Sequence, residues 1–254
     1  MKSRTACIVG LCLTALVGGC GSSGGARATT TTTIGQTPKE LAAEKTLAET
    51  ENLRLSDFPT GWTTTPNPQN NPSAPAIETE LASCLHRPVA FFDHRYSATA
   101  SSPQFQDAAG DEQVSSEIRY DASAALAEEQ FTVLQESQFP SCFGSALDAL
   151  IAFEIRHPDK TSASVPTGLT FGTSKVARTP FPSYGDRSIA YRLTLPVSDS
   201  GTTVDSYFDF VAVQQGRVAI TLLCVGLGTP FDTTMEQKLT TVTVGRVVGS
   251  LANV

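Results

Sequence analysis

The most constraining feature of the sequence is a block of three alternating segments near the C-terminus, separated by two turn signals. Apolar and polar residues alternate over 187–197, 202–213 and 218–225, which is the pattern of half-buried β-strands. The two links contain Asp199-Ser200-Gly201 and Gln214-Gln215-Gly216. Short links with glycine are typical of β-hairpins. The block therefore predicts three consecutive antiparallel strands.

Helical patterns surround this block. A strand is expected over 113–120 and helices over 121–138 and 142–156, and Thr233-Thr234-Met235-Glu236 is a capping box that opens a terminal helix. Helices clustered among hairpin-linked strands predict an α+β fold, with an antiparallel sheet of about five to seven strands covered by helices mainly on one face. Because we find no internal repeat and no second linker, we expect a single domain over 53–254.

The N-terminus has the pattern of a lipoprotein export signal. Lys2 and Arg4 precede a twelve-residue apolar stretch over 6–17. At about 1.5 Å per residue this stretch is too short to cross a bilayer as a helix. The run Val17-Gly18-Gly19-Cys20 then resembles a bacterial lipobox. We expect a signal peptide over 1–19 and acyl chains, such as palmitate, on Cys20.

An ordinary secretory signal with a chance cysteine is the alternative. The residues that follow favour the lipoprotein interpretation, because the Gly/Ser run over 21–25 and the five threonines over 29–33 can bury nothing and predict a flexible tether. Thr37-Pro38-Lys39-Glu40 is a capping box, so a short helix over 39–51 should end this 20–52 segment. These features predict a protein held by lipid on the extracytoplasmic side of the cell membrane.

Three of the six cysteines remain for the folded part, namely Cys84, Cys142 and Cys224. An odd number in an oxidising compartment allows one disulfide and one remaining thiol. Cys84 and Cys142 occupy helix positions near a loop, whereas Cys224 shares its strand face with apolar residues. We therefore predict a Cys84–Cys142 disulfide and a buried, core Cys224. A reactive Cys224 is the weaker alternative, because no His or Lys lies nearby in sequence to lower its pKa.

Motifs for catalysis, cofactors or metals are scarce. His86 and His94 lack the tight spacings of zinc ligands and are interpreted as polar loop residues. The sequence has no Gly-x-Ser-x-Gly elbow and no phosphate-binding loop. Asp205 and Asp209 share a strand face about 13 Å apart, wider than the carboxylate pairs of glycosidases, and are interpreted as a solvated surface. We expect no cofactor, no metal and no enzymatic activity.

The net charge and the aromatic residues of the sequence indicate which kinds of binding partner to expect. The net charge of −7 argues against nucleic acid, because phosphate binding needs a basic surface. Four aromatic side chains, Trp62, Phe91, Phe92 and Tyr96, either line an apolar ligand cleft or fill the core.

Three motifs resemble the envelope lipoproteins of actinobacteria. Leu55-Ser56-Asp57-Phe58-Pro59-Thr60-Gly61-Trp62 is similar to the L-x-D-L-P-x-G-W opening of lipoproteins and sensor-like domains of that group, and Phe139-Pro140-Ser141-Cys142 and the 218–232 segment look like the same group. The layout resembles, more distantly, the extracellular sensor domain of PknH-type mycobacterial kinases. That resemblance implies an α+β, disulfide-braced domain with a ligand cleft. This chain departs from it in having thiols for one bridge rather than two, and in having no kinase and no spanning helix.

The expected function is that of a binding or sensor-like module on a membrane anchor. Its ligand would be a small apolar molecule or a glycolipid, or its partner an envelope protein. Two alternatives remain open: a hydrolase of envelope material with a dispersed active site, and a purely structural envelope protein.

Overall fold

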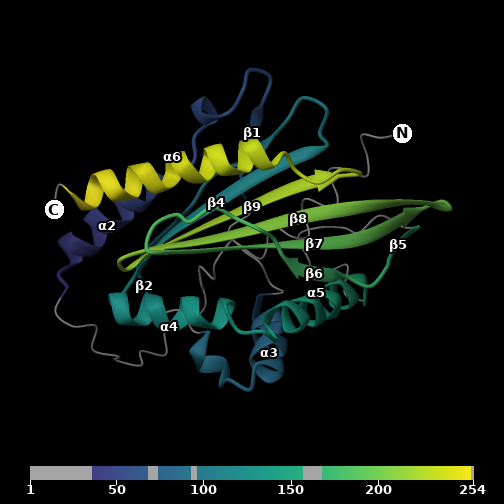
Figure 1. The fold of residues 1–254 in the computed structure, drawn as a ribbon, viewed down its shortest axis with the longest axis horizontal. Helices are drawn as coiled ribbons and strands as arrows, with labels where there is room; N and C mark the ends of the chain where they lie inside the picture. The colour runs from purple at the N-terminus through teal and green to yellow at the C-terminus, as the bar shows by residue number, and fades with distance from the viewer. Residues whose placement is uncertain (1–35, 68–73, 93–95, 157–167, 253–254) are drawn as a thin grey trace.

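The computed structural model describes residues 36–67, 74–92, 96–156 and 168–252, which form an antiparallel sheet with helices on both faces (Figure 1). The helices are α2 (Pro38–Glu51), α3 (Ala74–Cys84), α4 (Ala124–Leu134), α5 (Phe139–Arg156) and α6 (Thr233–Leu251), with 3₁₀ turns η2 (Leu55–Asp57) and η3 (Val89–Phe91). The strands are β1 (Thr63–Thr65), β2 (Tyr96–Ser101), β3 (Gln104–Gln106), β4 (Glu112–Asp121), β5 (Leu169–Phe171), β6 (Lys175–Arg178), β7 (Arg187–Asp199), β8 (Thr202–Gln215) and β9 (Val218–Leu227).

The α+β prediction is confirmed, and the sheet is larger than expected. Its nine strands follow the order β1-β3-β4-β9-β8-β7-β5, with β2 also paired to β4 and β6 also paired to β7. The extra strands are short: β1, β3 and β5 have three residues each and β6 has four. Such short segments carry no readable alternation, and they become strands by pairing with the long central ones.

The predicted hairpins form the centre of the sheet. β7 pairs with β8 across a turn at Ser200 and Gly201, which both have positive φ, at 50° and 86°. Positive φ at both central residues is the type I′ geometry that suits the twist of a two-residue hairpin. The tight turn fixes the register, so that Arg192 lies opposite Asp209. In the next hairpin Asp209 lies opposite Cys224.

Helices cover both faces of the sheet, which corrects the expectation that they lie mainly on one. We call the side of α2 and α6 the α6 face and the side of α3, α4 and α5 the α5 face (Figure 1). On β9 the adjacent residues Leu222 and Leu223 are both buried and belong to the apolar clusters of opposite faces. Because side chains alternate across a strand, a central strand that is apolar in both registers needs cover on both sides.

The first described helix, α2, is part of this packing. Its N-terminus has the predicted capping box between Thr37 and Glu40. Ala48 is fully buried on the α6 face, and the buried Glu44 accepts hydrogen bonds from Arg217 and Ser97, which belong to the sheet region. A charged side chain held by two partners fixes the helix in one position. The helix that follows the predicted tether is therefore bound to the sheet.

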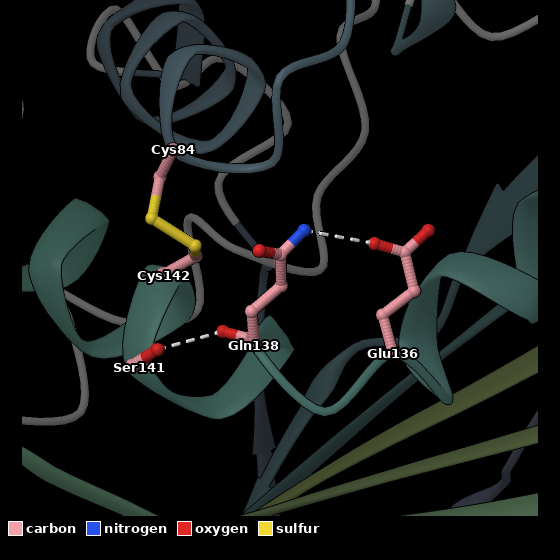
Figure 2. The surroundings of a disulfide bond; sticks show 5 residues. All are labelled: Cys84, Glu136, Gln138, Ser141 and Cys142. Atoms are coloured by element: carbon pink, nitrogen blue, oxygen red, sulfur yellow. Dashed lines mark hydrogen bonds between the residues drawn. A yellow bond between two sulfur atoms is a disulfide. The ribbon is translucent and has the colours of Figure 1, made fainter.

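The predicted disulfide is present and joins α3 to α5 (Figure 2). The Cα atoms of Cys84 and Cys142 lie 5.5 Å apart, and the sulfur atoms are bonded. Close to Cys142, the Ser141 hydroxyl donates a hydrogen bond to the Gln138 carbonyl oxygen at 2.8 Å (Figure 2). Cys224 is a free, buried thiol, as predicted. The bond links two helices on the same face of the sheet.

Candidate functional site

The four aromatic residues proposed for a ligand cleft lie in separate places. Trp62 packs on the α6 face against Phe58, with ring centroids 4.7 Å apart. Phe91 and Phe92 pack against the apolar cluster of the α5 face, with their own centroids 5.3 Å apart. Tyr96 begins β2 at the edge of β4. The structure thus does not bring the four residues into one cleft, because the sheet lies between Trp62 and the two phenylalanines.

A buried charged cluster lies on the α6 face and was not predicted. It consists of Arg192 on β7, Asp209 on β8, Glu236 on α6 and the neighbouring thiol of Cys224 on β9; we call it the α6 cluster. The guanidinium of Arg192 donates two hydrogen bonds to the Asp209 carboxylate, at 2.6 Å from Nε and 2.7 Å from the terminal nitrogen. This two-point geometry is the strongest form of an Arg–carboxylate contact.

Glu236 reaches the α6 cluster from the first turn of α6. Asp232 is the N-cap, and its carboxylate accepts a hydrogen bond from the Met235 backbone N–H at 2.9 Å. The predicted capping box had placed the cap at Thr233, one residue later. With the helix starting at Asp232 instead, the Glu236 side chain does not turn back to the cap but forms a hydrogen bond with Asp209. Both carboxyl groups are deeply buried, with 4% of Glu236 and 3% of Asp209 exposed.

This environment raises the pKa of Glu236 to about 8. Burial is the largest cause, since it disfavours the charged carboxylate, and the negative charge of Asp209 acts in the same direction. Arg192 opposes both effects, but its guanidinium is already paired with Asp209. The hydrogen bond to Asp209 in turn raises the pKa of Arg192. Below about pH 8 the stable state is therefore a neutral Glu236 beside an Arg192–Asp209 ion pair.

Cys224 is held as a neutral thiol by the same surroundings. Burial raises its pKa well above the ordinary value, and the carboxyl groups of Glu236, Asp209 and Glu112 add to that effect. A thiolate is the reactive form of cysteine, so this thiol is chemically inert while it stays covered. The structure agrees with the prediction of a core residue here.

The α6 cluster can hold one proton between two carboxyl groups. It offers little to a substrate, because its two acids and its thiol are buried, and only the Arg192 side chain, 27% exposed, reaches solvent. Within the described ranges, His, Cys, Asp and Glu side chains form no group of three or more suited to a metal ion. Proton binding is the chemistry that these residues support.

The α6 cluster corrects two interpretations made from the sequence. Asp209 was interpreted as a solvated strand residue, and that interpretation is wrong because α6 covers it; Asp205 remains only half-buried. Glu236 was interpreted as the closing residue of a capping box at Thr233, which is wrong because the N-cap is Asp232, and Arg192 was not singled out. The register of the β7–β8 hairpin could have indicated Arg192, because it places this residue opposite Asp209. Cys20 and His94 lie outside the described residues.

Comparisons with known proteins give only distant likenesses, and these are to solved structures. Neither a protein-family model nor a curated protein sequence matches the chain. Among solved structures, the extracellular domain of PknH from Mycobacterium tuberculosis aligns with 81% of this chain and 96% of its own, at 11% identity and a TM-score of 0.40. A likeness this distant carries no statement about function. None of the helices in the described part combines the length and apolar composition that a membrane span requires.

Proposed function

We propose that the protein is a lipid-anchored, extracytoplasmic binding module without enzymatic activity. In this proposal Cys20 carries the lipid and residues 20–37 form the flexible tether. The α+β domain binds a small apolar or glycolipid ligand or an envelope protein partner. The sensor-like part of the proposal rests on the sequence motifs around Trp62 and Cys142. A hydrolase and a purely structural protein remain the alternatives.

The observation that carries the proposal is the disulfide between Cys84 and Cys142. Disulfides persist in oxidising compartments and are rare in the cytosol, where thiols are kept reduced. A bridge between two helices of the folded domain therefore supports an address outside the cytoplasm. The lipobox at Val17–Cys20 supports the same address independently, because lipid attachment to that cysteine follows export.

The surface around η3 supports an apolar or amphiphilic ligand. Val89 is 44% exposed, and the neighbouring Phe91 and Phe92 are half-buried. The Arg87 guanidinium lies 5.4 Å from the Phe91 ring centroid and forms an ion pair with Glu136 at 2.8 Å. Apolar side chains next to a cation suit a molecule with an acyl part and an anionic or hydroxylated head. We refer to Arg87, Val89, Phe91 and Phe92 as the η3 edge.

Anchoring is tested by metabolic labelling with an alkyne-tagged palmitate, followed by membrane fractionation. Wild type should take up the label and sediment with membranes, because two or more acyl chains give stable attachment. Cys20→Ser should remain unlabelled and be recovered in the soluble fraction. Cys12→Ser is the matched control, since it removes a cysteine of the predicted signal peptide outside the lipobox. Labelling of Cys20→Ser at the wild-type level would refute the anchor.

Binding is tested by native mass spectrometry of protein extracted from its own membrane. Wild type should carry an apolar or glycolipid molecule that Phe91→Ala loses at least in part. Phe181→Ala is the matched control, because it removes a partly buried phenylalanine on the α6 face. Equal retention by Phe91→Ala would refute the η3 edge as the site. A wild-type protein with neither ligand nor partner would contradict the binding function and favour a structural role.

A further inference from the structure

The positive and negative charges of the α6 cluster are equal only when one of its two carboxyl groups is protonated. Arg192 supplies one positive charge and Asp209 one negative charge, and the two groups are joined by a bidentate contact. Glu236 is therefore accommodated as a neutral acid that donates its proton to Asp209. If Glu236 ionises without moving, two buried carboxylates share a single cation. An uncompensated buried charge is strongly destabilising.

No second cation compensates for this among the described groups that pack on the first turn. The titratable and charged groups facing that turn are Arg192 on β7, Asp209 and Tyr207 on β8, Cys224 on β9, Glu112 on β4, Tyr184 before β7 and the N-cap Asp232. Lys238, on the same helix, points away and donates to the Asp57 carbonyl oxygen. The helix N-terminus favours a carboxylate, but burial and Asp209 outweigh it, since the net effect is a raised pKa of Glu236.

The turn that holds Glu236 is closely packed on the end of the sheet. Phe231, just before the N-cap, is buried, and its ring stands edge-on to Trp62 at 6.5 Å. Gly226 lies so near this segment that a Cβ there would overlap the Thr229 carbonyl oxygen. Movement of the first turn would therefore disturb Trp62 and uncover Cys224.

We propose that the first turn of α6 is a proton-dependent latch: the protonated carboxyl of Glu236 bonds to the Asp209–Arg192 pair and holds the turn on the sheet, and loss of that proton to solvent releases the turn. The exchange involves one proton and no other reactant. The latch is closed at acidic and neutral pH and opens under alkaline conditions. It stabilises the domain toward acid, where folds that depend on ionised carboxylates weaken. This inference does not depend on the proposed anchor or ligand.

The experiment uses the full chain and two reporters already present in it. Trp62 is the single tryptophan of the sequence, so its fluorescence reports the contact with Phe231. Alkylation of Cys224, followed by peptide mass spectrometry and divided by its rate in the unfolded chain at the same pH, reports opening. Wild type is compared with Glu236→Gln, which keeps the donor but cannot lose a proton. Glu129→Gln, an exposed position on α4, is the matched control.

The expected result is a pH-dependent opening that Glu236→Gln abolishes. Between about pH 4.5 and pH 8, the relative alkylation of Cys224 in wild type and in Glu129→Gln should rise about tenfold per pH unit and then level off, because within this range each opening releases one proton. The Trp62 spectrum should shift over the same interval. In Glu236→Gln both signals should stay constant. An equal rise in Glu236→Gln, which would point to Glu112 or another group, overturns the proposal.

A second measurement keeps the test decisive if Glu236→Gln does not fold. Carboxyl ¹³C NMR of wild type, with selectively labelled glutamate, reads the protonation of Glu236 directly. The proposal expects a protonated Glu236 at pH 7 and an α6 amide shift that titrates together with it. A Glu236 that is ionised at pH 7, or that titrates without any change in α6, overturns the latch.

Discussion

Replacing the buried Glu236 with glutamine should make the protein more stable at neutral pH. Such a change usually destabilises, because it removes one partner of a buried polar contact. Here glutamine has nearly the same shape, and its side-chain amide can donate the hydrogen bond that the protonated carboxyl gives to Asp209. The variant differs from wild type in that folding no longer requires the uptake of a proton.

The size of the effect follows from the proton balance. The pKa of Glu236 is raised from 4.5 in the unfolded chain to about 8 in the fold, so between these values the folded state holds one proton more. Stability is therefore fully present below pH 4.5 and falls, as the pH rises toward 8, by about 1.4 kcal/mol per pH unit. From pH 4.5 to pH 7 the loss is about 3 kcal/mol, and glutamine avoids it.

The assay is urea unfolding at a series of pH values, followed by far-UV circular dichroism and Trp62 fluorescence without reductant. The stability of Glu236→Gln minus that of wild type should be near zero at about pH 4.5 and close to 3 kcal/mol at pH 7. Asp121 and Glu112, whose pKa values are also raised by burial, act equally in both proteins and cancel in the difference. Parallel stability curves for the two proteins would refute the reasoning.

Three further predictions concern covalent and backbone constraints. Changing Cys84 and Cys142 together to alanine should lower the free energy of unfolding by about 4 kcal/mol, since the bridge joins residues 58 apart; urea unfolding without reductant measures this, and unchanged stability would contradict it. Gly226→Ala should cost about 1–3 kcal/mol, because the new Cβ overlaps the Thr229 carbonyl oxygen, and an unchanged thermal midpoint would argue against that close approach. Gly245→Ala, exposed in α6 with open space around it, should instead stabilise by about 0.5–1 kcal/mol in the same melts, and a lower midpoint would count against it.

Local patterns predicted the parts of the fold that depend on nearby residues. The capping box at Thr37, the hairpin turn at Ser200 and Gly201 and the buried Cys224 all follow from a few adjacent positions. The composition of the segment 63–75 left a loop or an edge strand open, and the strand at Thr63–Thr65 could not be delimited in this way, because three residues contain no period and become a strand only beside β3. Cover on both faces was missed for a related reason, since an apolar run in one strand does not say how many helices exist to cover it.

The Arg192–Asp209 pair of the α6 cluster could have been predicted from the sequence, whereas the position of Glu236 could not. A two-residue turn at Ser200 and Gly201 pairs the residues that lie at equal distances from it, which puts Arg192 opposite Asp209. An arginine opposite an aspartate on one strand face indicates an ion pair rather than two solvated charges. No local rule gives Glu236, because its contact depends on where α6 crosses the sheet and on a helix start at Asp232 instead of Thr233. A shift of one residue at a cap rotates every side chain of a helix by about 100°. The group that sets the proposed proton response is thus the one that tertiary packing alone could reveal.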